Sequence, residues 1–205
     1  MVDVEIQARH DVDGGHRPEH PGGAVEMSAK KGGRDLQRQH LGGDHHRRPA
    51  GFAERIRHDG RVETALGTAS LARAIGTLKA KGVESVAVCY FHSYRDPTHE
   101  RMTAEAVRAA MPGCYVSLSS DVLPQIKEYE RTCTTVVNAY VGPALRRYLE
   151  RLEARLREAG FAGPLLIIQS HGGVATVADA VSLAAGAVLS GPAGGVAGSR
   201  HVARL

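Results

Sequence analysis

Two unbroken apolar runs constrain the fold of this chain more than any other feature. Residues 86–91 read VAVCYF, and residues 165–169 read LLIIQ. Because polar residues do not alternate with the apolar ones, each run predicts a strand that is buried on both faces, as in a parallel sheet. Segments with helical periodicity separate the two runs. This alternation is typical of an α/β protein in which layered helices cover a mostly parallel sheet.

The segments around the first run carry helix signals. Thr68 can cap a helix whose apolar residues recur at helical spacing and which Gly82 ends. Asp96-Pro97 is a good N-cap and first turn for a second helix, which ends at Pro112-Gly113 before a short strand candidate at residues 115–118. A strand, a helix and a second strand make a βαβ unit, which we expect to be right-handed.

A third helical region precedes the second apolar run. The pattern from Thr132 is helical to about Tyr140, and Gly142-Pro143 are expected to interrupt it, because proline removes a backbone donor and clashes with the preceding turn. The helix then resumes with a clear apolar stripe and ends at Gly160.

The composition changes near residue 53. Residues 1–53 consist largely of glycine pairs separated by His, Arg, Asp and Pro, and such a stretch cannot bury enough apolar surface to offset its ordering entropy. We expect a disordered or non-homologous arm over residues 1–53 and a partial domain over residues 54–205. The arm has six histidines, but their spacing fits no repeated ligand unit, so we predict no metal site. An alternative origin for the arm is a G+C-rich gene read in the wrong frame.

The net charge of +4 does not indicate a nucleic-acid partner. The arm holds eight basic and eight acidic side chains, and the rest of the chain holds 18 Lys/Arg against 14 Asp/Glu. Many of these charges are interleaved over residues 146–158, where a solvated helix face explains them. No zinc-finger or helix-turn-helix pattern occurs. We therefore exclude nucleic-acid binding from the expected functions.

Cysteine usage and hydropathy suggest the compartment. The three cysteines are widely spaced and form no CxxC pair, which favours free thiols in a reducing environment. The first residues lack the basic and apolar segments of a secretory signal, and no apolar stretch approaches the roughly 18 residues of a membrane span. We expect a soluble, cytoplasmic protein without a membrane segment.

Two glycine-rich segments are candidate ligand sites. Residues 170–173 (SHGG) directly follow the second apolar run, and ligands of open α/β sheets bind at the carboxyl ends of strands. A purely structural turn is the alternative. Residues 190–198 (SGPAGGVAG) resemble an anion-binding turn that leads into a helix, although the segment matches neither a P-loop nor GxGxxG. Close packing of a helix against a sheet explains these glycines equally well.

Two further segments carry polar side chains. Residues 128–138 (EYERTCTTVVN) place acids and hydroxyls at the start of a helix, where they either cap it or face a ligand. Residues 92–94 (HSY) stand at the carboxyl end of the first apolar run, but no GxSxG elbow accompanies them. Cys89 lies inside that run, and we expect its thiol to be buried and inert.

Four segments in order carry a family resemblance. Residues 83–100 (VESVAVCYFHSYRDPTHE), 120–143 (SDVLPQIKEYERTCTTVVNAYVGP), 148–174 (YLERLEARLREAGFAGPLLIIQSHGGV) and 189–198 (LSGPAGGVAG) resemble successive landmarks of the hydantoinase A/5-oxoprolinase family. This family includes a subunit type found in acetone carboxylases. The resemblance covers about three quarters of the chain, and four ordered motifs at normal separation are highly specific.

The resemblance implies a fold and an activity. Family members are expected to have an actin-like ATPase fold, in which two RNase H-like lobes close over ATP and Mg²⁺. ATP would phosphorylate the oxygen of a cyclic amide, so that water can open the ring, and Mg²⁺ with positioned donors would stabilise the phosphoryl transfer. A hydantoinase B-type subunit or domain is the implied partner. The substrate of the parent enzyme is left open between 5-oxoproline, a hydantoin and a ketone.

The resemblance also suggests site residues, but no catalytic residue. The nucleotide-side candidates are Ser190, Gly191, Gly194 and Gly195. His171 stands where the family commonly has Asn, and Cys133 where it commonly has Ser, so hydrogen bonds assigned to those side chains differ here. The substrate-side candidates are Arg131, Thr132, Asn138, Gln169, Ser170, His171, Gly172 and Gly173.

Two motifs of the family are missing. An acidic, glycine-rich DxGGTFTD loop and a similar DMGGTSTD loop bind phosphate and Mg²⁺ in family members, and neither occurs in this sequence. Without Mg²⁺ carboxylates a phosphoryl-transfer site should not turn over, so we predict no ATPase activity for this polypeptide alone. We interpret the chain as a fragment of an ATP-dependent cyclic-amide hydrolase. The alternative is a non-catalytic remnant or interaction module of that family.

Overall fold

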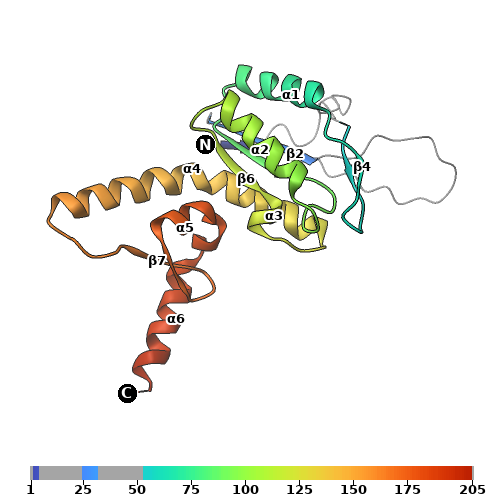
Figure 1. Cartoon of the computed structure of the whole chain (residues 1–205). Coiled ribbons are helices and arrows are strands. Elements are labelled where there is room, and N and C mark those ends of the chain that lie inside the picture. Colours follow the sequence, from blue (N-terminus) through green and yellow to red (C-terminus); the bar gives the residue numbers. More distant parts are fainter. Residues whose placement is uncertain (1, 5–24, 32–52, 205) are drawn as a thin grey trace, which may run out of the picture. The chain divides into compact units, whose positions relative to one another are not determined.

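The computed structural model describes residues 2–4, 25–31 and 53–204. The chain divides into two units, Met1–Tyr140 (unit 1) and Val141–Leu205 (unit 2), and helix α4 (Glu128–Glu158) contributes to both (Figure 1). The other elements are β1 (Val2–Val4), β2 (Val25–Lys31), β3 (Arg55–Ile56), β4 (Val62–Thr64), α1 (Thr68–Ala80), β5 (Ser85–Cys89), α2 (Thr98–Ala110), β6 (Tyr115–Leu118), α3 (Ser119–Val122), β7 (Leu166–Ile168), β8 (Val174–Thr176), α5 (Val177–Ser182), the 3-10 turn η1 (Ala184–Ala187) and α6 (Ser190–Val202).

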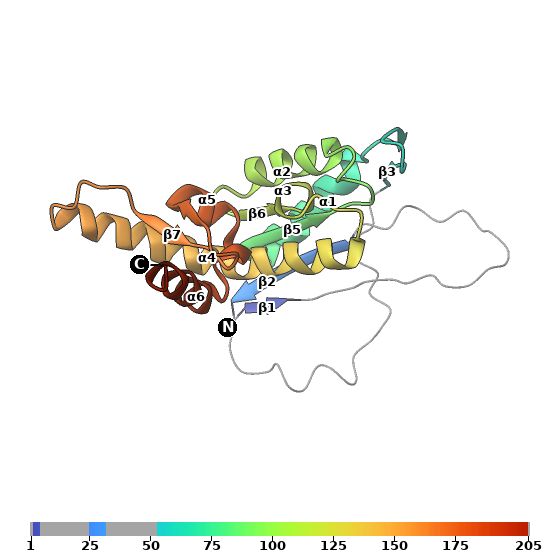
Figure 2. The same ribbon diagram turned by 90° about the horizontal axis from the view of Figure 1, so that it is seen from below.

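The main sheet of unit 1 has the order β1-β2-β5-β6 (Figure 2). Strands β5 and β6 are parallel, as expected for two strands joined through helix α2. Strand β2 is antiparallel to both of its neighbours, β1 and β5. The sheet is therefore mixed, and the expected parallel arrangement is confined to β5 and β6. The antiparallel strands come from residues 2–4 and 25–31, whose sequence carries no long apolar run that would have indicated a strand.

Strand β5 is buried on both faces, as its unbroken apolar sequence predicts. Successive side chains of a strand point to opposite faces. Val86 and Val88 belong to a core cluster with residues of α1 and α2, whereas Ala87 belongs to a second cluster with Val136 and Ala139 of α4. Helices therefore cover both faces of the sheet in unit 1, which confirms the predicted α/β layering.

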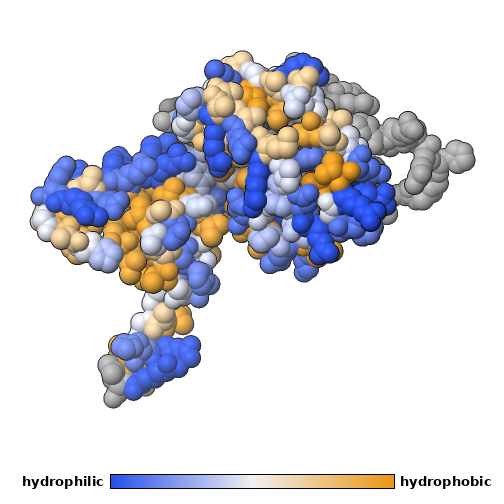
Figure 3. Space-filling view, in the orientation of Figure 1, coloured by the Kyte–Doolittle hydropathy of each residue, from blue (hydrophilic) through white to orange (hydrophobic). Residues whose placement is uncertain are grey.

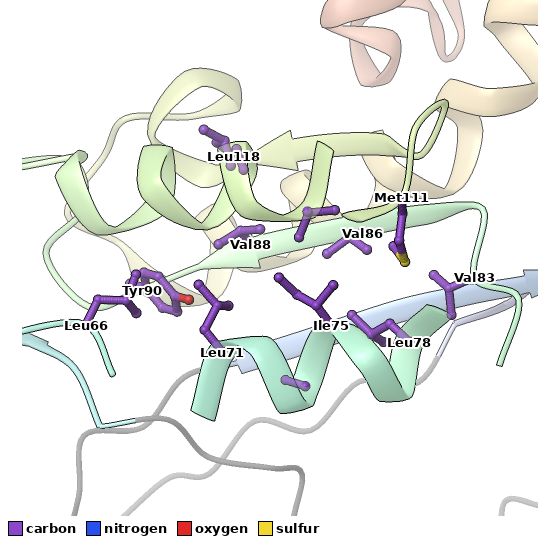
Figure 4. Close-up of a cluster of buried hydrophobic side chains, with 13 residues drawn as sticks. Leu66, Leu71, Ile75, Leu78, Val83, Val86, Val88, Tyr90, Met111 and Leu118 are labelled. Atoms are coloured by element: carbon purple, nitrogen blue, oxygen red, sulfur yellow. The ribbon is translucent and has the colours of Figure 1, made fainter. Parts of the chain in front are cut away.

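The larger cluster is mainly aliphatic, with Tyr90 and Met111 as its other members (Figure 4). Helix α1 presents Leu71, Ile75 and Leu78 to β5, and each is at most 7% exposed. Full burial of one such side chain contributes about 1.5–3 kcal/mol, so this face holds α1 on the sheet. The predicted helix is present and begins at Thr68, but the prediction that Thr68 caps it is wrong, because Gly67 is the N-cap and no side chain caps the helix.

Helix α4 runs without interruption through Pro143, so the predicted break at Gly142-Pro143 is wrong. A proline inside a helix costs about 3 kcal/mol, because it removes one donor and crowds the preceding turn. Packing compensates on both sides of it: Ala139 precedes the proline and Leu149 follows it, and both are buried. The proline signal is local, and the tertiary contacts override it.

The second apolar run forms β7, but the prediction of a parallel strand buried on both faces is wrong. Strand β7 pairs antiparallel with β8 in a two-stranded sheet. Leu166 is 50% exposed and Ile168 is 44% exposed. Helix α6 approaches β7 on this face, where Gly194 lies against Ile168, but it leaves Leu166 and Ile168 exposed, which the sequence of the strand alone could not reveal.

Two stretches of the amino-terminal arm, β1 and β2, belong to the main sheet. Most of the histidine-rich part of the arm lies outside the described residues, so the prediction of no metal site there stays a prediction. Among residues 2–4, 25–31 and 53–204, no helix is both long and apolar enough to cross a membrane.

Candidate functional site

Buried polar side chains gather where β5 and β6 end. The two strands are parallel, so their carboxyl ends meet at one edge of the sheet. Ser93 follows β5 and Ser119 follows β6, both are at most 1% exposed, and their hydroxyls lie 3.0 Å apart. This edge, together with Glu100 and Arg131, forms the polar cluster of unit 1.

Glu100 provides the negative charge of the polar cluster. It lies in the first turn of α2 and is fully buried. Three donors satisfy its carboxylate: the Tyr90 amide at 3.0 Å, the Ser119 hydroxyl at 2.5 Å and the Ser120 amide at 2.9 Å. Hydrogen bonds to a charged group contribute about 1.5–3 kcal/mol each, so Glu100 ties α2 to the ends of both strands.

Arg131 provides the positive charge. It lies near the start of α4, is 1% exposed, and donates from Nη1 to the Ser93 hydroxyl and from Nη2 to the Tyr90 carbonyl at 2.9 Å. Its Nε has no hydrogen-bond partner among the described residues. The charges of Arg131 and Glu100 are therefore joined through Ser93 and Ser119 rather than by a direct ion pair.

His92 stands at the surface of this edge in a strained conformation. Its φ is +57°, which is uncommon for a residue with a Cβ. Its Nδ1 lies 3.4 Å from the Tyr94 hydroxyl. Burial lowers the pKa of His92, and the charges of Arg55 and Arg131 lower it further, whereas Glu128 raises it. The imidazole is therefore neutral at pH 7 and carries one N–H donor.

Cys89 lies beside the polar cluster but has no chemical role in it. Burial raises the pKa of its thiol to about 12, and the charge of Glu100 acts in the same direction. A thiol with that pKa is not a nucleophile at neutral pH, in keeping with the prediction from the sequence.

The two other candidates of unit 1 differ in burial and in hydrogen bonding. Asn138 is fully buried, and its side-chain amide donates to the Tyr115 hydroxyl at 3.2 Å and to the Ser117 hydroxyl at 2.9 Å. That amide fixes α4 to β6. Thr132 is only partly buried and lies beside Arg131 in α4. Arg131 and Thr132 are thus placed near the strand ends, whereas Asn138 has a structural explanation.

The substrate-side candidates of unit 2 form the turn between β7 and β8. Gln169 is 4% exposed, and its backbone amide donates to the Gly173 carbonyl at 2.8 Å. The Gly172 amide donates back to the Gln169 carbonyl at 2.9 Å, and Gly172 has a φ of +86°. Glycine adopts that conformation without strain. The hairpin therefore explains the glycine, while Ser170 and His171 are exposed at the tip of the turn.

The nucleotide-side candidates lie in the first two turns of α6 rather than in a loop before it. Leu189, the residue before the helix, has a φ of +61°. A Cβ on Gly194 would lie 3.0 Å from Cδ1 of Ile168, so this glycine lets α6 approach β7, whereas a Cβ on Gly191 would meet nothing within 4 Å. The segment thus combines close packing with a helix N-terminus whose first residues, Ser190 and Gly191, are partly or fully exposed.

Glu100 and Ser119 were not among the site residues predicted from the sequence. Ser119 could have been found, because it directly follows the strand at residues 115–118 and so stands at the same edge as Ser93. The burial of Glu100 could not be predicted from the sequence, since an acid in the first turn of a helix is ordinarily exposed. Its burial depends on contacts with residues 10 to 20 positions away.

Comparison with known proteins gives a consistent picture. A family described as hydantoinase/oxoprolinase matches residues 131–205, and one described as hydantoinase/oxoprolinase N-terminal region matches residues 41–111. Caprolactamase subunit alpha of Pseudomonas jessenii is 42% identical over 149 residues, which are 73% of this chain and 21% of that protein. The 5-oxoprolinase of Saccharomyces cerevisiae is 36% identical over 129 residues, which are 63% of this chain and 10% of that protein.

Two solved structures share the fold. The nucleotide-free structure of acetone carboxylase matches with a TM-score of 0.64 at 28% identity, over 75% of this chain and 22% of that chain. The ATP-dependent caprolactamase from Pseudomonas jessenii matches with a TM-score of 0.60 at 37% identity, over 66% of this chain and 20% of that chain. The chain thus spans about a fifth or less of the length of these relatives.

Proposed function

Because this chain belongs to the hydantoinase/oxoprolinase family, we propose that it is part of an ATP-dependent enzyme that opens a cyclic amide. Its described residues form part of an α/β, actin-like fold. The observation that carries the proposal is the similarity to the caprolactamase subunit alpha, which extends over 149 residues. An amide is a poor electrophile until its oxygen becomes a good leaving group, and phosphorylation by ATP supplies that change.

The N-terminus of α6 is the proposed contact for the phosphates of ATP. The first amides of a helix have no partner within the helix, and the helix dipole favours an anion there. Ser190 and Gly191 begin α6, no acidic side chain lies in its first turn, and a side chain on Gly191 would meet no neighbour. These features support a phosphate approaching Ser190, Gly191, Gly194 and Gly195.

The described residues do not fit Mg²⁺. They include no group of three or more His, Cys, Asp or Glu side chains that could hold a metal ion. Mg²⁺ in phosphoryl-transfer sites is bound by carboxylates together with the substrate phosphates. We therefore assign no step of the reaction to a metal held by these residues.

In unit 1, we propose Arg131 and Thr132 as substrate-side residues. For unit 2, taken by itself, we propose the turn from Gln169 to Gly173. A guanidinium that is held by the Ser93 hydroxyl and the Tyr90 carbonyl is fixed in place, and a fixed cation can stabilise a developing negative charge. In the turn, the exposed side chains of Ser170 and His171 are the groups that could donate to a substrate carbonyl.

We propose that other polypeptide segments or subunits complete the site. Caprolactamase subunit alpha and the beta subunit of acetone carboxylase from Xanthobacter autotrophicus are named as subunits. Helix α6 has no buried residue, and Leu189, Val196 and Val202 are exposed apolar side chains of unit 2. Figure 3 shows apolar residues in orange at the surface of the chain. Exposed apolar surface of this kind favours a covering partner. A hydantoinase B-type subunit is the partner that the family suggests.

A non-catalytic interaction module is the second candidate, and the same exposed surface favours it. Titration of the purified chain with ATP separates the two proposals. Saturable binding at millimolar ATP or below, without turnover in the presence of Mg²⁺, supports a surviving phosphate contact in an incomplete enzyme. Absence of saturable binding supports the interaction module. Mg²⁺-dependent ATP hydrolysis by the chain alone would contradict the proposed incompleteness of the site.

A further inference from the structure

Two guanidiniums flank a series of three rings at the carboxyl end of β5. The guanidinium of Arg55 lies 5.1 Å from the ring centroid of Phe91, and the Phe91 and His92 centroids are 6.4 Å apart. The His92 and Tyr94 rings meet edge to face at 6.0 Å. The guanidinium of Arg131 lies 5.7 Å from the Tyr94 ring. We call this series, which begins and ends with a guanidinium, the Arg55–Arg131 ladder.

The two guanidiniums of the ladder lack matching carboxylates. Among the described residues, neither Arg55 nor Arg131 forms an ion pair within 4.0 Å. Glu100 reaches Arg131 only through two serine hydroxyls, and three donors already occupy its carboxylate. Arg131 is 1% exposed, and its Nε has no partner among the described residues. A buried guanidinium without a direct ion pair is unfavourable, and the carboxylates that act on this site do so from a distance: Glu100 through the two serines, and Glu128 through its charge on His92. An anion beside Arg55 would supply the direct partner that neither guanidinium has.

The centre of the ladder is held in a strained conformation. His92 has a φ of +57°, and its carbonyl accepts hydrogen bonds from the Arg95 amide at 2.8 Å and the Asp96 amide at 3.2 Å. Strain of this kind persists where the surroundings enforce it and is concentrated at ligand sites. The side chains of Arg55, His92 and Tyr94 are partly exposed, so a small molecule can reach this part of the ladder from solvent.

We infer that the Arg55–Arg131 ladder binds a small oxyanion, a carboxylate or a phosphate group, at His92. The guanidinium of Arg55 would contact two oxygens of the anion, since its donors match the geometry of both groups. The Tyr94 hydroxyl would donate to Nδ1 of His92, which leaves the proton on Nε2 and directs that N–H to the anion. The charge of Arg131 would stabilise the anion through space. This site lies in unit 1 and does not depend on the proposed nucleotide contact in unit 2.

The inference is tested by titrating the full chain with inorganic phosphate and, separately, with acetate at constant ionic strength. The ring signals of His92 are followed by NMR and are identified by their loss in His92→Gly. We expect a saturable shift of these signals and a higher pKa of His92 in the bound state, because a bound anion favours the imidazolium. Tighter binding of phosphate would indicate a phosphate ligand, and tighter binding of acetate would indicate a carboxylate ligand.

Two arginine variants provide the matched comparison. Arg55→Gln should weaken binding at least about tenfold, whereas Arg57→Gln should leave it unchanged, since Arg57 forms an exposed ion pair with Glu63 and is not among the main charges that act on His92. Tyr94→Phe keeps the ring but removes the hydroxyl that donates to Nδ1 of His92. The proton of His92 is then no longer held on Nε2, so binding should weaken. A shift that does not saturate, or equal weakening by Arg55→Gln and Arg57→Gln, would overturn the inference.

Discussion

The hydroxyl of Ser119, at the start of α3, donates a hydrogen bond of 2.5 Å to the carboxylate of Glu100, in the first turn of α2. Both residues are fully buried. The bond joins the end of β6 to the helix that precedes it, and the Tyr90 amide joins the end of β5 to the same carboxylate. Glu100 is therefore the side chain on which the geometry of the strand ends depends.

Replacement of this carboxylate should destabilise unit 1. In Glu100→Gln, the side-chain NH₂ would face backbone and hydroxyl donors, so we expect a loss of about 2–3 kcal/mol in the free energy of unfolding. Urea denaturation measures it. The control is Glu105→Gln, an exposed position of the same helix, which should change stability by less than about 0.5 kcal/mol. Equal effects of the two substitutions would show that the Glu100 hydrogen bonds contribute little.

The buried pair of Glu54 and His99 should make stability depend on pH. Glu54 Oε2 lies 2.9 Å from Nδ1 of His99, and burial raises the pKa of Glu54 from 4.5, although the hydrogen bond to His99 opposes the shift. A raised pKa means that the folded state binds the proton more tightly, so the contribution of Glu54 is greatest below pH 4.5 and is lost as pH rises through the folded pKa.

The variant Glu54→Gln isolates this contribution, because the amide resembles the protonated carboxyl group and does not titrate. As pH rises above 4.5, the original chain should lose unfolding free energy relative to Glu54→Gln. Urea denaturation at a series of pH values measures the difference. A difference that stays constant, or that moves in the opposite direction, would refute the raised pKa.

Thiol labelling should distinguish the three cysteines. Cys89 is buried with a pKa of about 12, whereas Cys114 and Cys133 are partly buried. We expect a thiol reagent at pH 8 to modify Cys114 and Cys133 in the native chain, and Cys89 only after denaturation, as identified by mass spectrometry of peptides. Modification of Cys89 in the native chain as fast as that of Cys133 would contradict its burial.

The elements with consistent local signals were predicted well, and the rest depended on distant contacts. The helix that begins at Thr68 and the strand at Val86 follow from helical periodicity and from an unbroken apolar run, both of which are properties of neighbouring residues. Pro143 gave a false stop, because the packing of Ala139 and Leu149 on either side of it is not visible locally. The LLIIQ strand gave a false expectation of burial, since burial depends on the layers around a strand.

The candidate site divides in the same way. The position of Ser93 at a strand end was predictable, and so was that of Arg131 at a helix start. The connection between them was not, because it passes through Ser119 and Glu100, which join the network only in the folded chain. For Asn138, the sequence could not distinguish a ligand contact from the hydrogen bonds to Tyr115 and Ser117 that the structure shows.

The strained residue before α6 offers a stabilising substitution. Leu189 has a φ of +61° and is 76% exposed, so its side chain contributes little packing within this chain. Glycine would relieve about 1–2 kcal/mol of backbone strain in the folded state. It would also cost about 0.4–1 kcal/mol of stability, because glycine raises the conformational entropy of the unfolded chain, so the net change favours the folded state. Leu189→Gly should therefore raise the melting temperature, as measured by circular dichroism. Leu189→Ala keeps the strain and should not, and an equal increase for both would exclude backbone strain as the cause.

ATP binding by two glycine variants of α6 decides whether this helix contacts the phosphates. Gly191 and Gly198 both have open space for a side chain, but only Gly191 lies in the first turn of the helix. If the helix N-terminus holds the phosphates, Gly191→Leu should weaken ATP binding at least about tenfold in a calorimetric titration, while Gly198→Leu leaves it unchanged. Equal affinities for the two variants, or no saturable binding by the original chain, would contradict the proposed nucleotide contact.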